Sequence, residues 1–174
     1  GGSDKVKYFA GFGYVKQDAL YGDTRTNKST SGFNRYNARV NIDANIVDKY
    51  LNLSADMAYR QEDRNSIAGS TSDVFNNMHR NPQTDPGRFP DGNLGKVSLG
   101  VNPIGLATEG GWVKDRKSVL NTRFMLDFNV PGLEGLNLKG IFSYDKIFNS
   151  IKRWTTPVDF YVWNKITGEY DGHS

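Results

Sequence analysis

Apolar and polar residues alternate without interruption along residues 35–46, which read RYNARVNIDANI. Every second side chain from Tyr36 to Ile46 is apolar or aromatic, and each residue between them is polar or charged. A period of two indicates a β-strand with two unlike faces. The apolar face meets a protein core in a soluble sheet, whereas in an outer-membrane barrel it meets lipid and the polar face lines the lumen.

The same alternation recurs along the chain and predicts an all-β protein. We expect strands over residues 5–17, 34–46, 51–62, 119–130 and 136–147. Their connections alternate in length: residues 47–50 and 131–135 form short turns, whereas about a dozen residues follow the first strand and a long loop covers residues 63–117. Short turns at one end and long loops at the other favour an antiparallel up-and-down meander that is part of a bacterial outer-membrane barrel.

The two short turns also predict the pairing of residues across each hairpin. Placing Ile46 opposite Leu51 keeps both faces consistent along the first hairpin. Placing Val130 opposite Leu136 puts Asp127 against Lys139 on the polar face and Phe124 against Phe142 on the apolar face. Cross-strand pairs of these kinds stabilise a sheet by roughly 0.2–1 kcal/mol each.

Tyrosines recur at the long-loop end of the apolar face. If the first strand runs toward the long loops, four of them reach matching heights, as a girdle of amphipathic rings at a membrane interface would require: Tyr14, Tyr36, Tyr59 and Tyr144. The alternative is that tyrosine is simply common in strands.

Composition and charge argue against several other classes of protein. The 174 residues carry a net charge of only +3, which does not point to nucleic acid, and no cysteine is present. No apolar run approaches the ~20 residues that a transmembrane helix needs. Two isolated histidines and the absence of a phosphate-binding loop or an HExxH motif argue against an enzyme, and no cofactor is expected.

Three separated blocks resemble one known family. The first two, GGSDKVKYFAGFGYVKQ and NRYNARVNIDANIVDKYLNL, look like the start of the barrel in SusC/RagA TonB-linked outer-membrane transporters, directly after their plug domain. The third, RNPQTDPGRFPDGNLG followed by NPIG, is similar to an extracellular segment of that family. The resemblance covers nearly the whole chain, residues 1–174; the departure is AGF at residues 10–12, where the family more often has a small residue, Ser and Leu.

The resemblance implies a plugged barrel of about 22 strands, of which this chain supplies roughly five. It implies uptake of oligosaccharides or peptides at the bacterial outer membrane, with a SusD-like surface lipoprotein as lid and TonB as the energy source. It also implies that the plug and the TonB box lie outside this sequence, so that the chain is a piece of a longer protein.

The long loop holds the candidate contacts to substrate or lid. Ser72 or Asp73 is expected to cap a short helix that carries Val74, Phe75 and Met78 and ends at 81–82, and TDPGRFPDGN predicts two consecutive turns. Aromatic residues near the end of the chain could stack on sugar rings, or could serve as strand residues or lid contacts. The candidate residues are Phe75, Arg88, Phe89, Trp112, Trp154, Tyr161 and Trp163.

Two alternatives stay open from the sequence. The loop could be a packed cap that rigidifies the barrel rim. The whole chain could instead be a soluble β-sandwich that binds carbohydrate or acts as an adhesin. The apolar faces of such a protein would pack against each other and not against lipid.

Overall fold

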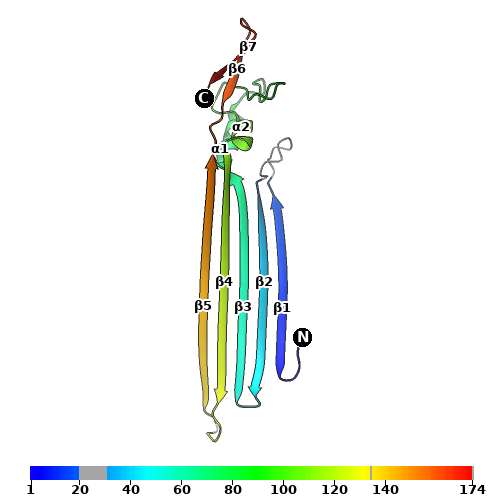
Figure 1. Cartoon of the computed structure of the whole chain (residues 1–174), viewed down its shortest axis with the longest axis vertical. Helices are drawn as coiled ribbons and strands as arrows, with labels where there is room; N and C mark the ends of the chain where they lie inside the picture. Colours follow the sequence, from blue (N-terminus) through cyan, green and yellow to red (C-terminus); the bar gives the residue numbers. More distant parts are fainter. Residues whose placement is uncertain (20–30, 134, 174) are drawn as a thin grey trace. The chain divides into compact units, whose positions relative to one another are not determined.

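A five-stranded antiparallel meander is the main element of the chain (Figure 1). The computed structural model describes residues 1–19, 31–133 and 135–173. The strands lie side by side in chain order: β1 (Val6–Asp18), β2 (Gly32–Val47), β3 (Leu51–Ile67), β4 (Gly111–Asn129) and β5 (Asn137–Thr155). The prediction of an all-β up-and-down meander is confirmed.

The strands differ from the prediction mainly at their long-loop ends. β3 ends at Ile67, β4 begins at Gly111 and β5 ends at Thr155, so the predicted loop over 63–117 is reduced to residues 68–110. The sequence-based limits were wrong here because the regular alternation of apolar and polar residues ends before the backbone pairing does. Most of the connection between β1 and β2 lies outside the described residues.

Smaller elements occupy the long loop and the end of the chain. Helix α1 (Thr71–Arg80) begins after Ser70, whose side chain accepts a hydrogen bond from the N–H of Ser72. The expected caps Ser72 and Asp73 are therefore wrong, and they lie in the first turn instead. A second helix, α2 (Pro103–Thr108), and a hairpin of β6 (Phe160–Asn164) with β7 (Glu169–His173) were not predicted. Neither α1 nor α2 is long and apolar enough to cross a membrane.

The register of the β4–β5 hairpin matches the prediction. The N–H of Val130 donates to the carbonyl of Leu136 at 3.0 Å, which places the two residues opposite each other. Farther along, the rings of Phe124 and Phe142 stack with centroids 6.5 Å apart. The same register still holds at the far end, where Thr156 N–H donates to Gly110 O at 3.2 Å.

The β2–β3 and β3–β4 ladders are also regular. In the first, the turn bond from Tyr50 N–H to Val47 O is 2.9 Å long and agrees with the predicted pairing of Ile46 with Leu51. In the second, bonds from Asn129 N–H to Tyr50 O at 2.7 Å and from Ala68 N–H to Gly111 O at 3.2 Å mark opposite ends of one register. A constant register keeps alternate side chains on one side of the sheet along the whole strand.

The tyrosines are not level across the sheet. The rings of Tyr14 and Tyr36 are neighbours, with centroids 5.0 Å apart. In the register of the β2–β3 ladder, however, Tyr36 lies opposite Gln61, so that Tyr59 lies two residues nearer the turn. By the same count across β4, Tyr144 lies four residues nearer the turn. The expected row of rings therefore runs obliquely across the strands.

The chain divides into two compact units. The strand unit comprises Gly1–Lys16, Asn34–Asp63 and Arg116–Ser150, and the loop unit comprises Gln17–Phe33, Arg64–Asp115 and Ile151–Ser174. Apolar side chains on the strands are largely exposed; Phe12 is 74% and Phe142 is 62% exposed. The loop unit has its own small core, in which Leu94 is 2% exposed.

The turn between β2 and β3 stores backbone strain at Lys49. Its φ of 70° lies in the left-handed region, which costs a residue with a Cβ about 1 kcal/mol. We expect Lys49→Gly to raise the free energy of unfolding by about 0.5 kcal/mol. Urea titration of the purified protein measures the change. The matched control is Asp48→Gly in the same turn, which relieves no such strain and should be neutral or destabilising; equal gains in both variants would contradict the assignment.

Candidate functional site

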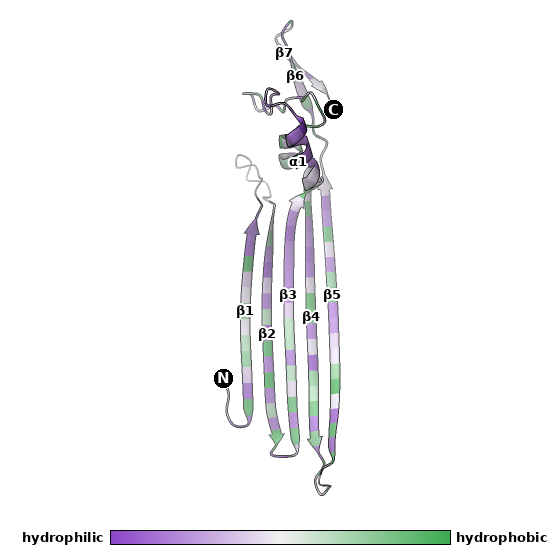
Figure 2. Cartoon of the chain, turned by 180° about the vertical axis from the view of Figure 1, so that it is seen from behind, coloured by the Kyte–Doolittle hydropathy of each residue, from purple (hydrophilic) through white to green (hydrophobic). Residues whose placement is uncertain are grey.

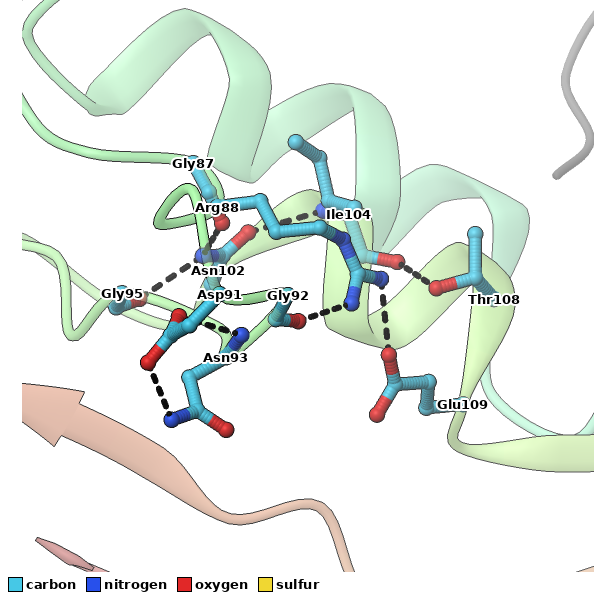
Figure 3. Close-up of polar contacts among 10 residues, drawn as sticks. All are labelled: Gly87, Arg88, Asp91, Gly92, Asn93, Gly95, Asn102, Ile104, Thr108 and Glu109. Atoms are coloured by element: carbon cyan, nitrogen blue, oxygen red, sulfur yellow. Dashed lines mark hydrogen bonds and ion pairs between the residues drawn. The ribbon is translucent and has the colours of Figure 1, made fainter. Parts of the chain in front are cut away.

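A buried asparagine holds the loop unit together (Figure 3). The side-chain amide of Asn102, whose residue is 1% exposed, donates two hydrogen bonds of 2.7 Å to the carbonyls of Gly87 and Gly95. Its side-chain oxygen accepts a bond of 2.9 Å from the N–H of Ile104 and so caps α2. One side chain therefore connects the start of a helix to two separate backbone segments.

Two turns lie beside this asparagine, and one of them is where the sequence predicts it. The bond from Gly92 N–H to Phe89 O at 2.9 Å confirms the second predicted turn. The first turn lies earlier than predicted, because Asp85 N–H donates to Pro82 O at 3.1 Å and the turn begins before Thr84. The second turn needs a glycine, because Gly92 has a φ of 99°. Asp91 steadies that turn by accepting bonds from the backbone and the side chain of Asn93 at 3.0 and 2.9 Å.

Arg88 is a structural residue of the turn. Its guanidinium donates to the carbonyl of Gly92 at 2.5 Å and forms an ion pair of 2.7 Å with Glu109 (Figure 3). Its side chain is 22% exposed. Because these contacts occupy both terminal nitrogens, Arg88 is less available to a ligand than the sequence prediction assumed.

Two of the predicted contact residues meet through a third aromatic residue. The ring of Tyr170 on β7 lies 5.0 Å from that of Phe89 and 4.9 Å from that of Trp163 on β6, centroid to centroid. We refer to Phe89, Trp163 and Tyr170 as the aromatic cluster. Trp163 is 44% exposed, and Phe89 and Tyr170 are half-buried, so that the cluster offers both a packed base and an accessible ring.

Burial and the carboxylate of Asp91, through its charge and a hydrogen bond, raise the pKa of the Tyr170 phenol above its usual value. Asp91 thereby connects the aromatic cluster to the turn that presents Phe89. The cluster contains no second titratable group, and its chemistry is that of stacking and hydrogen bonding.

The remaining candidates do not join the cluster. Phe75 lies on α1 and is 42% exposed. Tyr161 on β6 pairs through its backbone, donating to Leu94 O at 2.8 Å and accepting from Lys96 N–H at 2.9 Å. Trp112 lies near the start of β4 and Trp154 near the end of β5.

Two contributors to the site were missed from the sequence. Asn102 was noted only as part of an Asn-Pro motif, although asparagine followed by proline is a common start of a helix, with the proline at the first helical position. Tyr170 has no local signal, because its role depends on the β6–β7 pairing, in which it lies opposite Trp163.

The carboxylates of this region are engaged in contacts within the loop unit. The nearby carboxylates of Asp91 and Glu109 are held by hydrogen bonds or an ion pair, and among the described residues no group of three or more His, Cys, Asp or Glu could hold a metal ion. No model of a known protein family matches this sequence, and a search of curated proteins finds no significant match.

Removing the Asn102 side chain should open the loop unit. Asn102→Ala leaves two carbonyls and one N–H without partners, and buried unpaired groups cost about 1–3 kcal/mol each. We expect the local opening free energy near Gly87 and Gly95 to fall by about 2–4 kcal/mol, measured by hydrogen exchange. The control Asn93→Ala removes one side-chain bond to Asp91 and should change exchange by less than about 1 kcal/mol. Equal protection in both variants would refute the role of Asn102.

The phenol of Tyr170 provides a pH-dependent test of the aromatic cluster. The pKa of the phenol is raised in the folded chain, so folding favours the neutral phenol. This contribution to the free energy of unfolding is fully present below the usual tyrosine pKa of ~10 and is lost as the pH rises through the raised pKa. Asp91→Asn should bring this pKa down, as followed by the NMR signal of Tyr170 during titration. An unchanged pKa in Asp91→Asn would show that Asp91 does not contribute.

Proposed function

We propose that this chain is part of the barrel of a TonB-dependent outer-membrane importer that takes up oligosaccharides or peptides together with a SusD-like surface lipoprotein. No family match carries this proposal. It depends on the pattern of the strands, the resemblance of the three sequence blocks and the arrangement of the loop unit.

The length of the apolar face is the observation that carries the proposal. On one side of the meander, each strand has an apolar stretch of nine to eleven residues: Val6–Tyr14, Tyr36–Ile46, Leu51–Tyr59, Leu120–Val130 and Leu136–Tyr144. A tilted strand needs ~9–11 residues to cross the hydrocarbon core of a bilayer. Figure 2 shows the underlying alternation of hydrophobic and hydrophilic positions along β1 to β5.

The oblique row of tyrosines agrees with tilted strands. Neighbouring strands lie about 4.8 Å apart. At a tilt of about 40°, positions at the same depth in the membrane are therefore offset by roughly one residue from one strand to the next. Relative to Tyr36 on β2, Tyr59 on β3 and Tyr144 on β5 are displaced toward the turns by two and four residues in the established register. Rings displaced in this way return to similar depths once the strands tilt.

The edges of the sheet support a larger assembly. β1 and β5 are the edge strands of the five-stranded sheet, and every residue of β5 is exposed. Among the described residues, the outer edge of β1 is covered only at its start, where Gly2 pairs with Lys7. Unpaired backbone groups cannot be placed in hydrocarbon, so a lipid-facing sheet needs further strands on both sides. In the proposed barrel, other parts of the protein supply these strands, and the polar face of the sheet meets the lumen or a plug.

The aromatic cluster is the proposed contact surface for substrate or lid. Trp163 and Phe89 come from segments far apart in sequence, and both approach Tyr170. Aromatic faces with an adjacent phenol suit ligands that have both an apolar and a hydrogen-bonding side, as sugar rings and peptide groups do.

Spin labels on neighbouring residues test which face meets lipid. The chain has no cysteine, so Ile42→Cys and Asn41→Cys each introduce a unique labelling site in this chain. In the complete reading frame reconstituted in vesicles, we expect the label at 42 to be relaxed mainly by oxygen, which concentrates in lipid, and that at 41 mainly by a water-soluble nickel complex. Electron paramagnetic resonance measures both accessibilities.

The same experiment separates the alternative. In a soluble sandwich the label at 42 would lie in a protein core and resist both reagents, and this result would overturn the membrane assignment. A label at 42 that reacts mainly with the nickel complex would overturn it as well.

A further inference from the structure

An apolar pocket lies within the loop unit, lined by residues of α1, α2 and the chain between them. Its volume is about 490 Å³, within the range of pockets that bind small ligands. Val74 on α1 lies in its wall and is 3% exposed, whereas Met78 and Ile104 are exposed. The pocket therefore extends from the core of the loop unit to its surface.

The walls of the pocket are mostly aliphatic. Among the described residues that line it, none has an aromatic ring. A sugar would find no aromatic face to stack on in this pocket, and its hydroxyls would exchange water for carbon. The aliphatic wall residues include Val74, Met78, Val97, Pro103, Ile104 and Ala107. These walls suit an aliphatic side chain better than a sugar.

Most hydrogen-bond donors of the pocket are already used within the protein. The side chain of Asn102 is fully engaged by the bonds described above, and the hydroxyl of Thr108 donates to Ile104 O at 2.8 Å. The side-chain amide of Asn81 donates to a backbone carbonyl at 3.3 Å. Apart from the exposed Gln83, the side chains lining the pocket therefore have few free donors to offer a ligand.

Two acceptors of the pocket have capacity left. Asp85 is the one charged residue among the described residues that line it, and no ion pair in the described part of the chain includes its carboxylate. That carboxylate accepts bonds from the N–H and the hydroxyl of Ser98 at 2.6 and 2.8 Å, which leaves a lone pair on each oxygen. Asn81 directly precedes the turn that Asp85 closes, and its side-chain oxygen is buried without a hydrogen-bond partner. A ligand with a positively charged donor complements both groups, whereas an anionic ligand is repelled.

We infer that the pocket binds the N-terminal residue of a peptide whose first side chain is aliphatic. This side chain packs against Val74, Ile104 and Ala107, while the α-ammonium pairs with the carboxylate of Asp85 and donates a hydrogen bond to Asn81 Oδ1. A neutral sugar carries no ammonium, a fatty acid carries the opposite charge, and an internal segment of a partner protein has no α-ammonium. The inference rests on the proposed function for the role of the peptide as a substrate, and it selects peptides over oligosaccharides at this pocket.

Isothermal titration calorimetry of the complete protein in mild detergent tests the pocket. The probes are the tripeptide Leu-Gly-Gly, its N-acetylated form and Gly-Gly-Gly. Acetylation removes the positive charge and should weaken binding by about fivefold, as loss of an ion pair at a partly exposed site does. Gly-Gly-Gly lacks the aliphatic side chain and should bind at least about tenfold more weakly than Leu-Gly-Gly.

Variants of the pocket give an independent measurement. Asp85→Asn removes the charge and should weaken binding of Leu-Gly-Gly by about fivefold, while binding of the acetylated peptide stays unchanged. The matched control Asp115→Asn removes a carboxylate of the loop unit that does not line the pocket, so it should leave both affinities unchanged. Ala107→Phe fills the pocket and should abolish binding. Unchanged far-ultraviolet circular dichroism and thermal midpoint identify variants that fold normally.

The peptide comparisons on the unaltered protein decide the inference even where a variant does not fold. Absence of Leu-Gly-Gly binding, equal binding of its acetylated form, or equal affinities in Asp85→Asn and Asp115→Asn would each contradict it. Tighter binding of maltotriose or decanoate that Ala107→Phe abolishes would assign the pocket to a sugar or a fatty acid instead. The spin labels at 41 and 42 report separately on the membrane assignment, so failure of the pocket is distinguishable from failure of the proposed function.

Discussion

The backbone ladder of the meander determines on which side every strand residue lies, because a shift of one residue in a strand inverts both of its faces. The bonds at opposite ends of the β3–β4 and β4–β5 ladders belong to one register each. The apolar stretches therefore fall on a single side from strand to strand. This regularity underlies the proposed lipid face and the oblique row of tyrosines.

The loop unit is held together by different forces. It has few buried apolar side chains, of which Leu94 is the most enclosed, and it depends on hydrogen bonds from Asn102 to fix its turns against α2. The faces of the sheet repeat the same alternation of apolar and polar residues from strand to strand. The surface of the loop unit has no such repeat, and it contains the aromatic cluster. Recognition of a particular ligand suits the second kind of surface, because loops vary without disturbing the ladder that supports them.

Much of the sheet could be predicted from period and turn length. The pairing of Val130 with Leu136 followed from the need to keep both faces consistent across a five-residue turn, and the stacking of Phe124 on Phe142 confirms it. The prediction failed at the strand ends Ile67, Gly111 and Thr155, where pairing continues although apolar and polar residues no longer alternate regularly. An apolar pattern indicates where a strand is buried or faces lipid, whereas backbone bonds decide where the strand ends.

The sequence by itself determined the two faces of the meander, its hairpin registers and the turn around Asp91, because these depend on neighbours in the chain or on a short turn. Only the tertiary structure decided that Phe89 and Trp163 meet at Tyr170 and that Asn102 connects Gly87 with Gly95. These contacts join residues from separate elements, and the long loop between β3 and β4 carries no periodic signal from which such contacts could be read.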